Sequence, residues 1–235
     1  MTMSLNKINS TLYIVATPIG NLEDITFRAI RVLREADLIL CEDTRVTKKL
    51  LAKYEISARV ESYHAHTKIT KAERFLNMLA EGKNIALVSD AGTPAISDPG
   101  VLLVKMARAR FGHDAQIVPI PGPSALTTAI SAAGIPAAQF TFLGFLPHKK
   151  GRETAFRRIA DSSDPIIFYE SPHRIMKTLR ALAKSLPHNR KICIARELTK
   201  IHESFVSGSA EEVEKHFLAH PDQVRGECVV IVEGK

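Results

Sequence analysis

A stretch of turn-forming and hydrogen-bonding residues follows one of the apolar runs of this 235-residue chain. It reads LVSDAGTPAISDPG over residues 87–100 and holds two aspartates, two glycines, two prolines, two serines and a threonine. Gly92 and Gly100 permit backbone conformations that other residues avoid, and Pro94 and Pro99 stiffen the path between them. Such a loop can direct fixed N–H and C=O groups at a neutral or cationic ligand, which suits an adenosine and a sulfonium better than a triphosphate. An ordinary surface loop is the alternative.

Three further polar loops also follow apolar runs of strand length. They are ATPIGN (16–21), PIPGPSA (119–125) and FYESPHR (168–174). In an open parallel sheet, the loops at the carboxyl ends of the strands line the ligand crevice. We therefore expect these loops and residues 87–100 to be the ligand-binding segments of the chain.

Several well-known nucleotide, hydrolase and metal motifs are absent. Only Gly20 of a G-x-G-x-x-G fingerprint follows the first apolar run, and no GxxxxGK[ST] occurs. In PGPSAL, Leu126 takes the place of the second glycine of a nucleophile elbow. There is no HExxH or paired CxxC. His64 and His66 have the spacing of two ligands on one strand face, but no convincing third ligand is near, so we expect no metal site.

The composition is that of an ordinary globular protein, with 45% hydrophobic and 24% charged residues. A net charge of +7 fits an anionic partner such as RNA, and equally a basic soluble enzyme.

Cys41, Cys193 and Cys228 lie far apart in apolar runs, which predicts reduced, packed thiols. No stretch approaches the ~20 apolar residues of a membrane span, and the N-terminus lacks the apolar core of a secretion signal. We therefore expect a cytoplasmic protein.

Apolar runs alternate with segments of helical period along the first part of the chain, which is typical of parallel βαβ units. The expected strands cover residues 11–16, 37–41, 84–89, 116–120 and 140–144. The expected helices cover residues 25–36, 44–54, 72–82, 100–111 and 124–134.

Residues 144–153, GFLPHKKGRE, interrupt this pattern with glycine, proline and four basic side chains, and we expect them to form a linker. Beyond them the expected strands are 165–170, 191–196, 203–208 and 227–234, and the expected helices 173–186 and 210–220. The short loop within residues 191–208 favours a mixed sheet. The sequence therefore predicts two α/β domains, residues 1–120 and residues 121–235, the second including a bridging helix and the basic linker.

These motifs together resemble the tetrapyrrole-methylase superfamily. The resemblance also rests on CEDTR (41–45), GFLPHK (144–149), RELTKIHE (196–203) and the terminal GECVVIVEG (226–234). Within the superfamily they are most similar to bacterial enzymes that methylate the ribose 2′-oxygen of a cytidine in small-subunit (16S) ribosomal RNA. The resemblance runs from about residue 11 to the end, with the motifs in the expected order. Ala16 stands where glycine is expected.

The resemblance implies an N-terminal domain with a mainly parallel sheet and a C-terminal domain with a mixed sheet. It further implies S-adenosylmethionine bound in a cleft between the two domains, and a homodimer. From the residues themselves, we expect neither a metal nor a membrane as a partner. Residues 87–100 would then form the main cradle of the cofactor. The cofactor-binding residues that it implies are Pro18, Asp90, Gly92, Thr93, Pro94, Ile96, Ser97, Ser124, Ala125, Tyr169 and Glu170.

Methyl transfer from a sulfonium to a ribose hydroxyl is an in-line displacement, which depends on holding the two reactants in line. Because a 2′-hydroxyl is a very weak acid, a positioned base would help. The candidate bases are Asp43, Glu170, Glu197 and Lys200. Two of them have structural alternatives. Asp43 would cap a helix that begins at Thr44, and Glu197 would form an ion pair with Arg196 between the domains.

The RNA would be held by basic side chains near the second expected helix and in the linker, with Tyr63 or His64 stacking on an extruded base. The predicted RNA-binding residues are Arg45, Lys48, Lys49, His64, Lys149, Lys150 and Arg152. A solvated linker is the alternative for residues 149–153. Two other functions stay open: a C-methyltransferase of a corrin or porphyrin, and a non-catalytic RNA-binding protein with a vestigial cofactor cleft.

Overall fold

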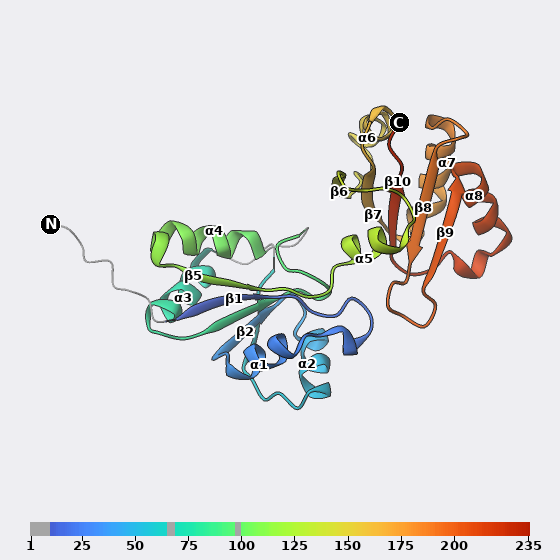
Figure 1. Cartoon of the computed structure of the whole chain (residues 1–235). Coiled ribbons are helices and arrows are strands. Elements are labelled where there is room, and N and C mark those ends of the chain that lie inside the picture. The colour runs from blue at the N-terminus through green and yellow to red at the C-terminus, as the bar shows by residue number, and fades with distance from the viewer. Residues whose placement is uncertain (1–9, 65–68, 97–99) are drawn as a thin grey trace. The chain divides into compact units, whose positions relative to one another are not determined.

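The computed structural model describes residues 10–64, 69–96 and 100–235. The chain divides into two compact units, unit 1 (Met1–Ser124) and unit 2 (Ala125–Lys235). In the described residues each unit is built on its own five-stranded sheet (Figure 1). The division at Ser124 places the loop of residues 121–124 with the first sheet.

Unit 1 contains a parallel sheet. Its described strands are β1 (Thr11–Val15), β2 (Leu38–Cys41), β3 (Val60–Ser62), β4 (Ile85–Val88) and β5 (Gln116–Ile120). The strand order is β3-β2-β4-β1-β5, and every neighbouring pair is parallel. The strands β2 and β4 read LILC and IALV and are buried at every position, as expected of a parallel sheet covered on both faces.

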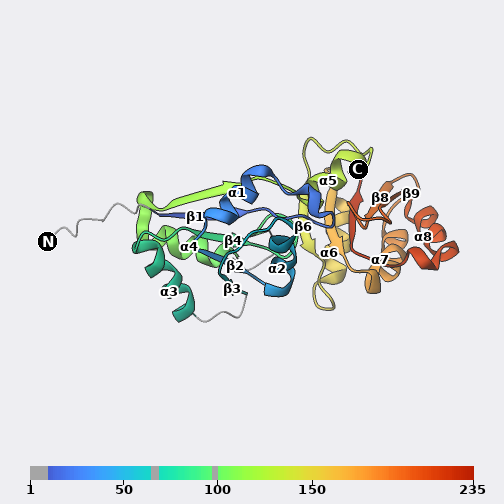
Figure 2. The same cartoon turned by 90° about the horizontal axis from the view of Figure 1, so that it is seen from below.

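Helices cover both faces of this sheet. They are α1 (Phe27–Glu35), α2 (Thr44–Lys53), α3 (Ile69–Ala80) and α4 (Gly100–Phe111), with short 3₁₀ helices at Leu22–Asp24 and Gly112–Asp114. Successive strand residues point to opposite faces. Ile39 and Cys41 therefore join the core formed with α1 and α2, whereas Leu38 and Leu40 join the core formed with α3 and α4. Figure 1 shows these two pairs of helices on opposite sides of the sheet, and Figure 2 shows the same sheet from below.

Side-chain caps determine where the first two helices begin. The hydroxyl of Thr26 accepts a hydrogen bond from the backbone N–H of Ala29 at 3.1 Å. The carboxylate of Asp43 accepts one from the backbone N–H of Arg45 at 2.8 Å. Both contacts satisfy a helix N–H that has no partner within the helix. The helix-capping alternative for Asp43 is thus confirmed, and only Glu42 and Asp43 separate the end of β2 from the start of α2.

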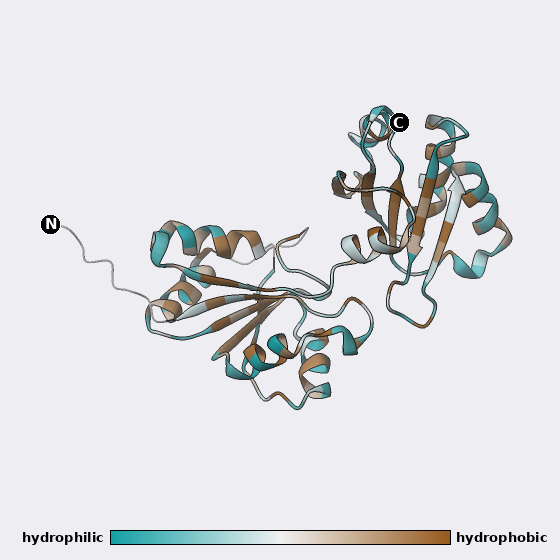
Figure 3. Cartoon of the chain, viewed as in Figure 1, coloured by the Kyte–Doolittle hydropathy of each residue, from teal (hydrophilic) through white to brown (hydrophobic). Residues whose placement is uncertain are grey.

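Unit 2 contains a mixed sheet. Its strands are β6 (Thr141–Phe145), β7 (Ile166–Glu170), β8 (Lys191–Arg196), β9 (Ser204–Ser209) and β10 (Cys228–Val232). The order is β6-β7-β10-β8-β9, in which only the pair β6–β7 is parallel. The helices are α5 (Ala125–Ala132), α6 (Arg152–Asp161), α7 (Pro172–Ser185) and α8 (Ala210–Ala219), with a 3₁₀ helix at Pro221–Gln223. Figure 3 shows the hydrophobic colour along the central strands, which belong to the buried core of the unit.

The predicted fold class is confirmed, with a parallel sheet in unit 1 and a mixed sheet in unit 2. The antiparallel pair β8–β9 confirms the mixed sheet expected within residues 191–208. The linker prediction holds only for residues 146–151, because Gly144 and Phe145 end β6 and Arg152 begins α6. Sequence analysis also missed two elements, the helix α6 and the three-residue edge strand β3.

Candidate active site

The loops that follow β1 and β4 are hydrogen-bonded to each other at the carboxyl ends of the parallel strands, which we call the loop edge of unit 1. The backbone N–H of Thr17 donates to the C=O of Gly92 at 3.0 Å, and the N–H of Gly92 donates to the C=O of Thr17 at 3.0 Å. The hydroxyl of Ser89 donates to the Gly92 oxygen at 3.0 Å, and the hydroxyl of Thr17 donates to the Ser89 oxygen at 3.0 Å. All three residues are buried, so these bonds fix the start of the 90–96 loop on the sheet.

Gly92 lies where three loops approach closely. Its φ is +83°, a left-handed conformation that favours glycine. A Cβ at this position would lie 3.3 Å from Cγ2 of Ile19 and 3.6 Å from the carbonyl oxygen of Pro123. The hydroxyl of Thr93 donates to that same Pro123 oxygen at 3.3 Å. A larger side chain at residue 92 would therefore push the loops after β1, β4 and β5 apart.

Two other residues of these loops have unusual surroundings. A Cβ at Gly122 would lie 3.0 Å from the Cβ of Ala16, so alanine fits at residue 16 because residue 122 has no side chain. Ala95 has a φ of +69°, which non-glycine residues rarely adopt. Backbone strain of this kind is concentrated at ligand-binding segments.

The structure places most of the predicted cofactor residues of unit 1 at this edge. Pro18 and Pro94 are buried and directly follow Thr17 and Thr93. Ile96 is 43% exposed. The carboxylate of Asp90 accepts a hydrogen bond from the backbone N–H of Asp43 at 2.9 Å, which joins the end of β2 to the same edge. Ser97 lies outside the described residues. Ser124, the last residue of unit 1, directly precedes α5.

The carboxylate of Asp43 is hydrogen-bonded to the guanidinium group of Arg45 on α2. It accepts hydrogen bonds from Arg45 Nε at 3.1 Å and Nη2 at 2.6 Å, besides the backbone bond that caps the helix. The hydrogen bonds of Arg45 lower the pKa of Asp43 to about 2. A carboxylate with so low a pKa accepts a proton poorly at neutral pH. The predicted role of Asp43 as a general base is therefore not supported.

Glu170, at the end of β7, has a completely buried side chain. Its Oε1 accepts hydrogen bonds from Arg174 Nε at 2.6 Å and the Ser171 N–H at 2.9 Å, and its Oε2 accepts one from the Thr178 hydroxyl at 2.7 Å. Arg152 Nη2 donates to the Thr178 hydroxyl at 2.7 Å and lies 3.5 Å from Oε2. The burial argues against Glu170 as a base or side-chain ligand of the cofactor. It also argues against an RNA contact by Arg152, whose side chain is only 9% exposed.

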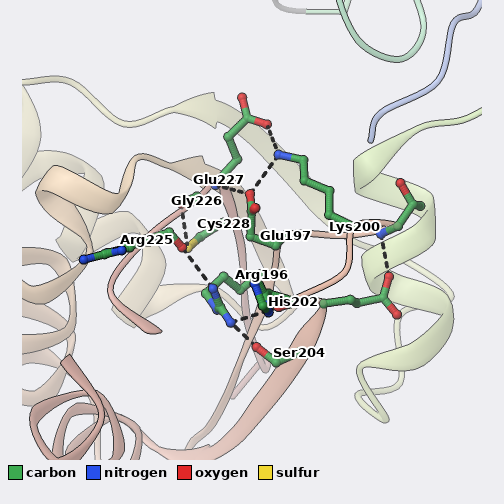
Figure 4. A network of polar contacts seen from close by, with 11 residues as sticks. Arg196, Glu197, Lys200, His202, Ser204, Arg225, Gly226, Glu227 and Cys228 are labelled. Carbon is green, nitrogen blue, oxygen red and sulfur yellow. Dashed lines mark hydrogen bonds and ion pairs between the residues drawn. The ribbon is translucent and has the colours of Figure 1, made fainter. Parts of the chain in front are cut away.

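Glu197 and Lys200 form an ion pair in the turn between β8 and β9 (Figure 4). Lys200 Nζ donates to Glu197 Oε1 at 2.8 Å and lies 3.4 Å from Glu227 Oε2. Burial opposes the ionisation of both groups, but their mutual contacts outweigh it, so the pKa of Glu197 is lowered and that of Lys200 is raised. Glu197 and Thr199 have φ values of +51° and +65°. The turn thus presents a charged pair on a strained backbone.

Arg196 contacts the backbone at the base of this turn (Figure 4). The predicted ion pair between Arg196 and Glu197 is not found among the described residues, in which Glu197 pairs with Lys200. Its guanidinium donates to the Ser204 hydroxyl at 3.2 Å and to the carbonyl oxygens of His202 at 2.9 Å and Arg225 at 3.3 Å. These contacts join the two ends of the β8–β9 turn to the segment before β10. The conformation of Glu197 and Lys200 is therefore held from within unit 2.

Tyr169 and Ala125 lie on elements of unit 2 that contact each other. The ring of Tyr169 packs edge-on against Phe142, with centroids 4.9 Å apart, and lies 5.4 Å from Phe145. Burial raises the pKa of Tyr169, and a hydrogen bond with the backbone of Leu126 partly opposes this effect. Because Leu126 follows Ala125 at the start of α5, Ala125 and Tyr169 belong to one local structure.

The remaining predicted RNA-binding residues are exposed. Arg45, Lys48 and Lys49 project from α2 within about one turn of one another. His64 follows β3, and residues 149–150 precede α6. Within the part of the chain that the structure describes, no cluster of three or more His, Cys, Asp or Glu side chains is arranged to hold a metal ion, and no helix is long and apolar enough to cross a membrane.

The profile of the Tetrapyrrole (Corrin/Porphyrin) Methylases matches residues 11–214. The chain belongs to this family. This methylase is similar to proteins named Ribosomal RNA small subunit methyltransferase I. The protein of Halalkalibacterium halodurans is 51% identical over 95% of this chain and 76% of its own length. The protein of Bacillus subtilis is 48% identical over 95% of this chain and 75% of its own length. The protein of Thermotoga maritima is 45% identical over 95% of this chain and 98% of its own length.

Solved structures of methyltransferases share the fold of this methylase. Cobalt precorrin-4 methyltransferase CbiF has a TM-score of 0.68 at 17% identity, covering 96% of this chain and 95% of its own. Uroporphyrin-III-C-methyltransferase from Thermus thermophilus has a TM-score of 0.62 at 17% identity, covering 95% of this chain and 94% of its own. At such identities the likeness shows the fold alone.

Sequence analysis missed four residues that shape these regions of the methylase. Thr17 and Ser89 fix the loop edge, and Arg174 and Thr178 surround the buried carboxylate. A usable signal existed for the second pair, because Arg174 and Thr178 are spaced by four on α7, and this helix begins just after Glu170. The first pair carried a weaker signal, a hydroxyl directly after a fully apolar run.

We expect Arg45→Ala to raise the pKa of Asp43 from about 2 toward, but not fully to, the ordinary value of 3.8, because the backbone N–H of residue 45 still donates. A carboxyl-carbon NMR titration would measure it. Because the pKa of Asp43 is lower in the folded state than in the unfolded state, its contact with Arg45 stabilises the fold at pH values above the ordinary pKa of 3.8. This stabilisation is lost as the pH falls through about 2. Arg59→Ala, which breaks the separate pair with Glu61, is the control and leaves the Asp43 midpoint unchanged. A midpoint still near 2 in Arg45→Ala would contradict the assignment.

Proposed function

We propose that this methylase transfers the methyl group of S-adenosylmethionine to the ribose 2′-oxygen of a cytidine in small-subunit (16S) ribosomal RNA. The observation that carries the proposal is its 43–51% identity, over 95–98% of the chain, to proteins named Ribosomal RNA small subunit methyltransferase I. Those names state the reaction, methyl transfer, and the substrate, ribosomal RNA of the small subunit. Beyond them we propose the ribose oxygen of a cytidine as the methyl acceptor, a homodimer and a cytoplasmic location.

The loop edge of unit 1 is the proposed binding site of the cofactor. The close approach at Gly92 fits a ligand held mainly by main-chain groups, because residue 92 has no side chain and its backbone lies close to Ile19 and to the carbonyl group of Pro123. The proposed contacts in unit 1 are Pro18, Asp90, Gly92, Thr93, Pro94, Ile96, Ser97 and Ser124. The contribution of Ala125 and Tyr169 from unit 2 stays a prediction.

The bound cofactor would supply a methyl group on a positively charged sulfur. Because that charge disappears during an in-line displacement, the protein needs to align the reactants and accept a proton, and it needs no site for a developing anion. Glu197 and Lys200 keep partly exposed side chains, 19% and 34%. We assign Glu197 as the acceptor of the hydroxyl proton and Lys200 as the group that holds its carboxylate in place. The proposed RNA contacts are Arg45, Lys48, Lys49, His64, Lys149 and Lys150.

A tetrapyrrole C-methyltransferase is the second candidate, since solved structures of that class share the fold. The much higher identity to the ribosomal RNA methyltransferases favours RNA. A non-catalytic RNA-binding protein is the third candidate. It is distinguished by binding of S-adenosylmethionine and RNA without methyl transfer.

Cells that lack this protein should lose one ribose methyl group from a cytidine of small-subunit RNA, and the purified protein should restore it from S-adenosylmethionine. Mass-spectrometric mapping of the RNA from both sources measures the outcome. An unchanged methylation pattern, or transfer to a uroporphyrinogen in place of RNA, would contradict the proposed function.

Gly92→Val should weaken binding of S-adenosylmethionine at least about tenfold, which is about 1.4 kcal/mol. Gly82→Val is the matched control, because Gly82 has a similar φ of +87° but open space around its Cβ position. Both variants carry similar backbone strain, so a difference between them in calorimetry reports the crowding of the loops. Equal affinities in the two variants would rule out a cofactor site at the Gly92 approach.

Glu197→Gln should lower kcat by roughly 10²-fold or more, while the affinity for S-adenosylmethionine stays unchanged, because the variant removes only the proton acceptor. Glu227→Gln serves as the control, since Glu227 is the other carboxylate that contacts Lys200. Single-turnover methyl transfer measures the rate. Equal losses in both variants would instead indicate that only the charge around Lys200 matters.

A further inference from the structure

A loop that carries three exposed cationic or imidazole side chains joins β6 to α6. This basic loop, residues 146–151, contains His148, Lys149 and Lys150. None of the three forms an ion pair with a described residue. Gly151, which has a φ of +85°, is the N-cap residue of α6 and provides no side-chain cap. The loop therefore needs other contacts to keep one conformation.

Two guanidinium groups supply these contacts from inside unit 2. Arg174 Nη1 donates to the carbonyl oxygen of Leu146 at 3.0 Å, and Arg152 Nη1 donates to that of Pro147 at 3.1 Å. The two carbonyl groups are consecutive and lie at the start of the basic loop. Leu146 is only 2% exposed, so its carbonyl group would be costly to leave without a donor.

The buried carboxylate of Glu170 holds both arginines. It reaches Arg174 directly, at 2.6 Å, and reaches Arg152 mainly through the hydroxyl of Thr178. That hydroxyl accepts from Arg152 at 2.7 Å and donates to Glu170 at 2.7 Å. The planar fork of an arginine suits this bridging of two acceptors, which a lysine would not reproduce. Two cations beside one carboxylate leave an excess of positive charge, and the loop carbonyl oxygens offset part of it.

We propose that Arg152, Glu170, Arg174 and Thr178 form a positioning network that holds the basic loop ready for the phosphates of the RNA substrate. The proposal rests on the proposed function for the identity of the RNA. A loop that is already ordered loses less conformational freedom when it binds, so the network raises RNA affinity without touching the RNA. Glu170 and Arg152 are then positioning residues.

The first experiment measures the loop without RNA. Arg174→Met removes the guanidinium and keeps an apolar chain, and Thr178→Val removes only the hydroxyl. Trypsin cleavage after Lys149 and Lys150 is followed by mass spectrometry on the full chain. Both variants should be cleaved several-fold faster than wild type, and Arg174→Lys should be cleaved at an intermediate rate.

Arg190→Met is the matched control for a general loss of stability. The buried guanidinium of Arg190 also binds carbonyl oxygens, those of Ile159, Ala160, Ser162 and Glu233, none of which belongs to the basic loop. This variant should unfold at a lower temperature and yet be cleaved after Lys149 and Lys150 at the wild-type rate. Wild-type cleavage in Arg174→Met and Thr178→Val, or equally fast cleavage in Arg190→Met, would overturn the proposal.

The second experiment measures binding to a small-subunit RNA fragment over a series of salt concentrations. Replacing Lys149 and Lys150 by alanine should lower the slope of log K against log salt by about 0.7 for each lost single-strand phosphate contact. Arg174→Met and Thr178→Val keep both lysines and should nevertheless lower the affinity and the slope, with S-adenosylmethionine affinity unchanged. Wild-type RNA binding by a variant whose loop is cleaved faster would overturn the proposal.

Failure of the proposed function would give a different result. The wild-type protein would then transfer no methyl group to RNA, although trypsin would still detect release of the loop in Arg174→Met.

Discussion

The reciprocal hydrogen bonds between Thr17 and Gly92 are the constraint on which the candidate site depends. Neighbouring parallel strands end at the same edge, so β1 and β4 bring their loops side by side. The polypeptide then has to satisfy the backbone groups that no longer belong to the sheet. The two residues do so for each other, and Ser89 adds a further donor. The loop after β4 is thereby fixed at its start by main-chain contacts, which leave its later residues free to differ in side chain.

Unit 2 is organised differently, because buried arginines connect its irregular segments. Arg152, Arg190 and Arg196 are each less than one-tenth exposed and donate to backbone carbonyl groups of loops and of the C-terminal end of α6. A guanidinium has five donors in a rigid plane, so one side chain can satisfy several carbonyl groups that have no strand or helix partner. The net charge of +7 therefore overstates the cationic surface available to an RNA, since part of the positive charge is used inside the fold.

The alternation of apolar runs and helical periods predicted most of the fold, because burial of whole strands such as β2 and β4 leaves a plain pattern in the sequence. It did not predict α6, because glycine, proline and basic residues just before Arg152 favour a linker locally, whereas the helix is stabilised by packing of Phe156 and Ile159 in the core. The position of Glu170 was equally hidden. A carboxylate in a polar motif suggests exposure, whereas this one is enclosed by Arg174 and Thr178 of the next helix and by Arg152, which only the fold brings near.

The environments of the four candidate bases separate them on physical grounds. Asp43 is held ionised by Arg45, and Glu170 is enclosed by donors, so neither offers a basic oxygen to an incoming hydroxyl group. Glu197, the proposed proton acceptor, is partly exposed, but Lys200 lowers its pKa, which makes it a weak base. The pKa of Lys200 is raised by Glu197 and Glu227, so this ammonium group keeps its proton. A reaction at a hydroxyl as weakly acidic as that of ribose would then depend chiefly on alignment with the methyl donor, for which oriented reactants can supply up to ~7–11 kcal/mol. A fold whose candidate binding segments are fixed by main-chain pairing in one unit and by buried arginines in the other is suited to catalysis of that kind.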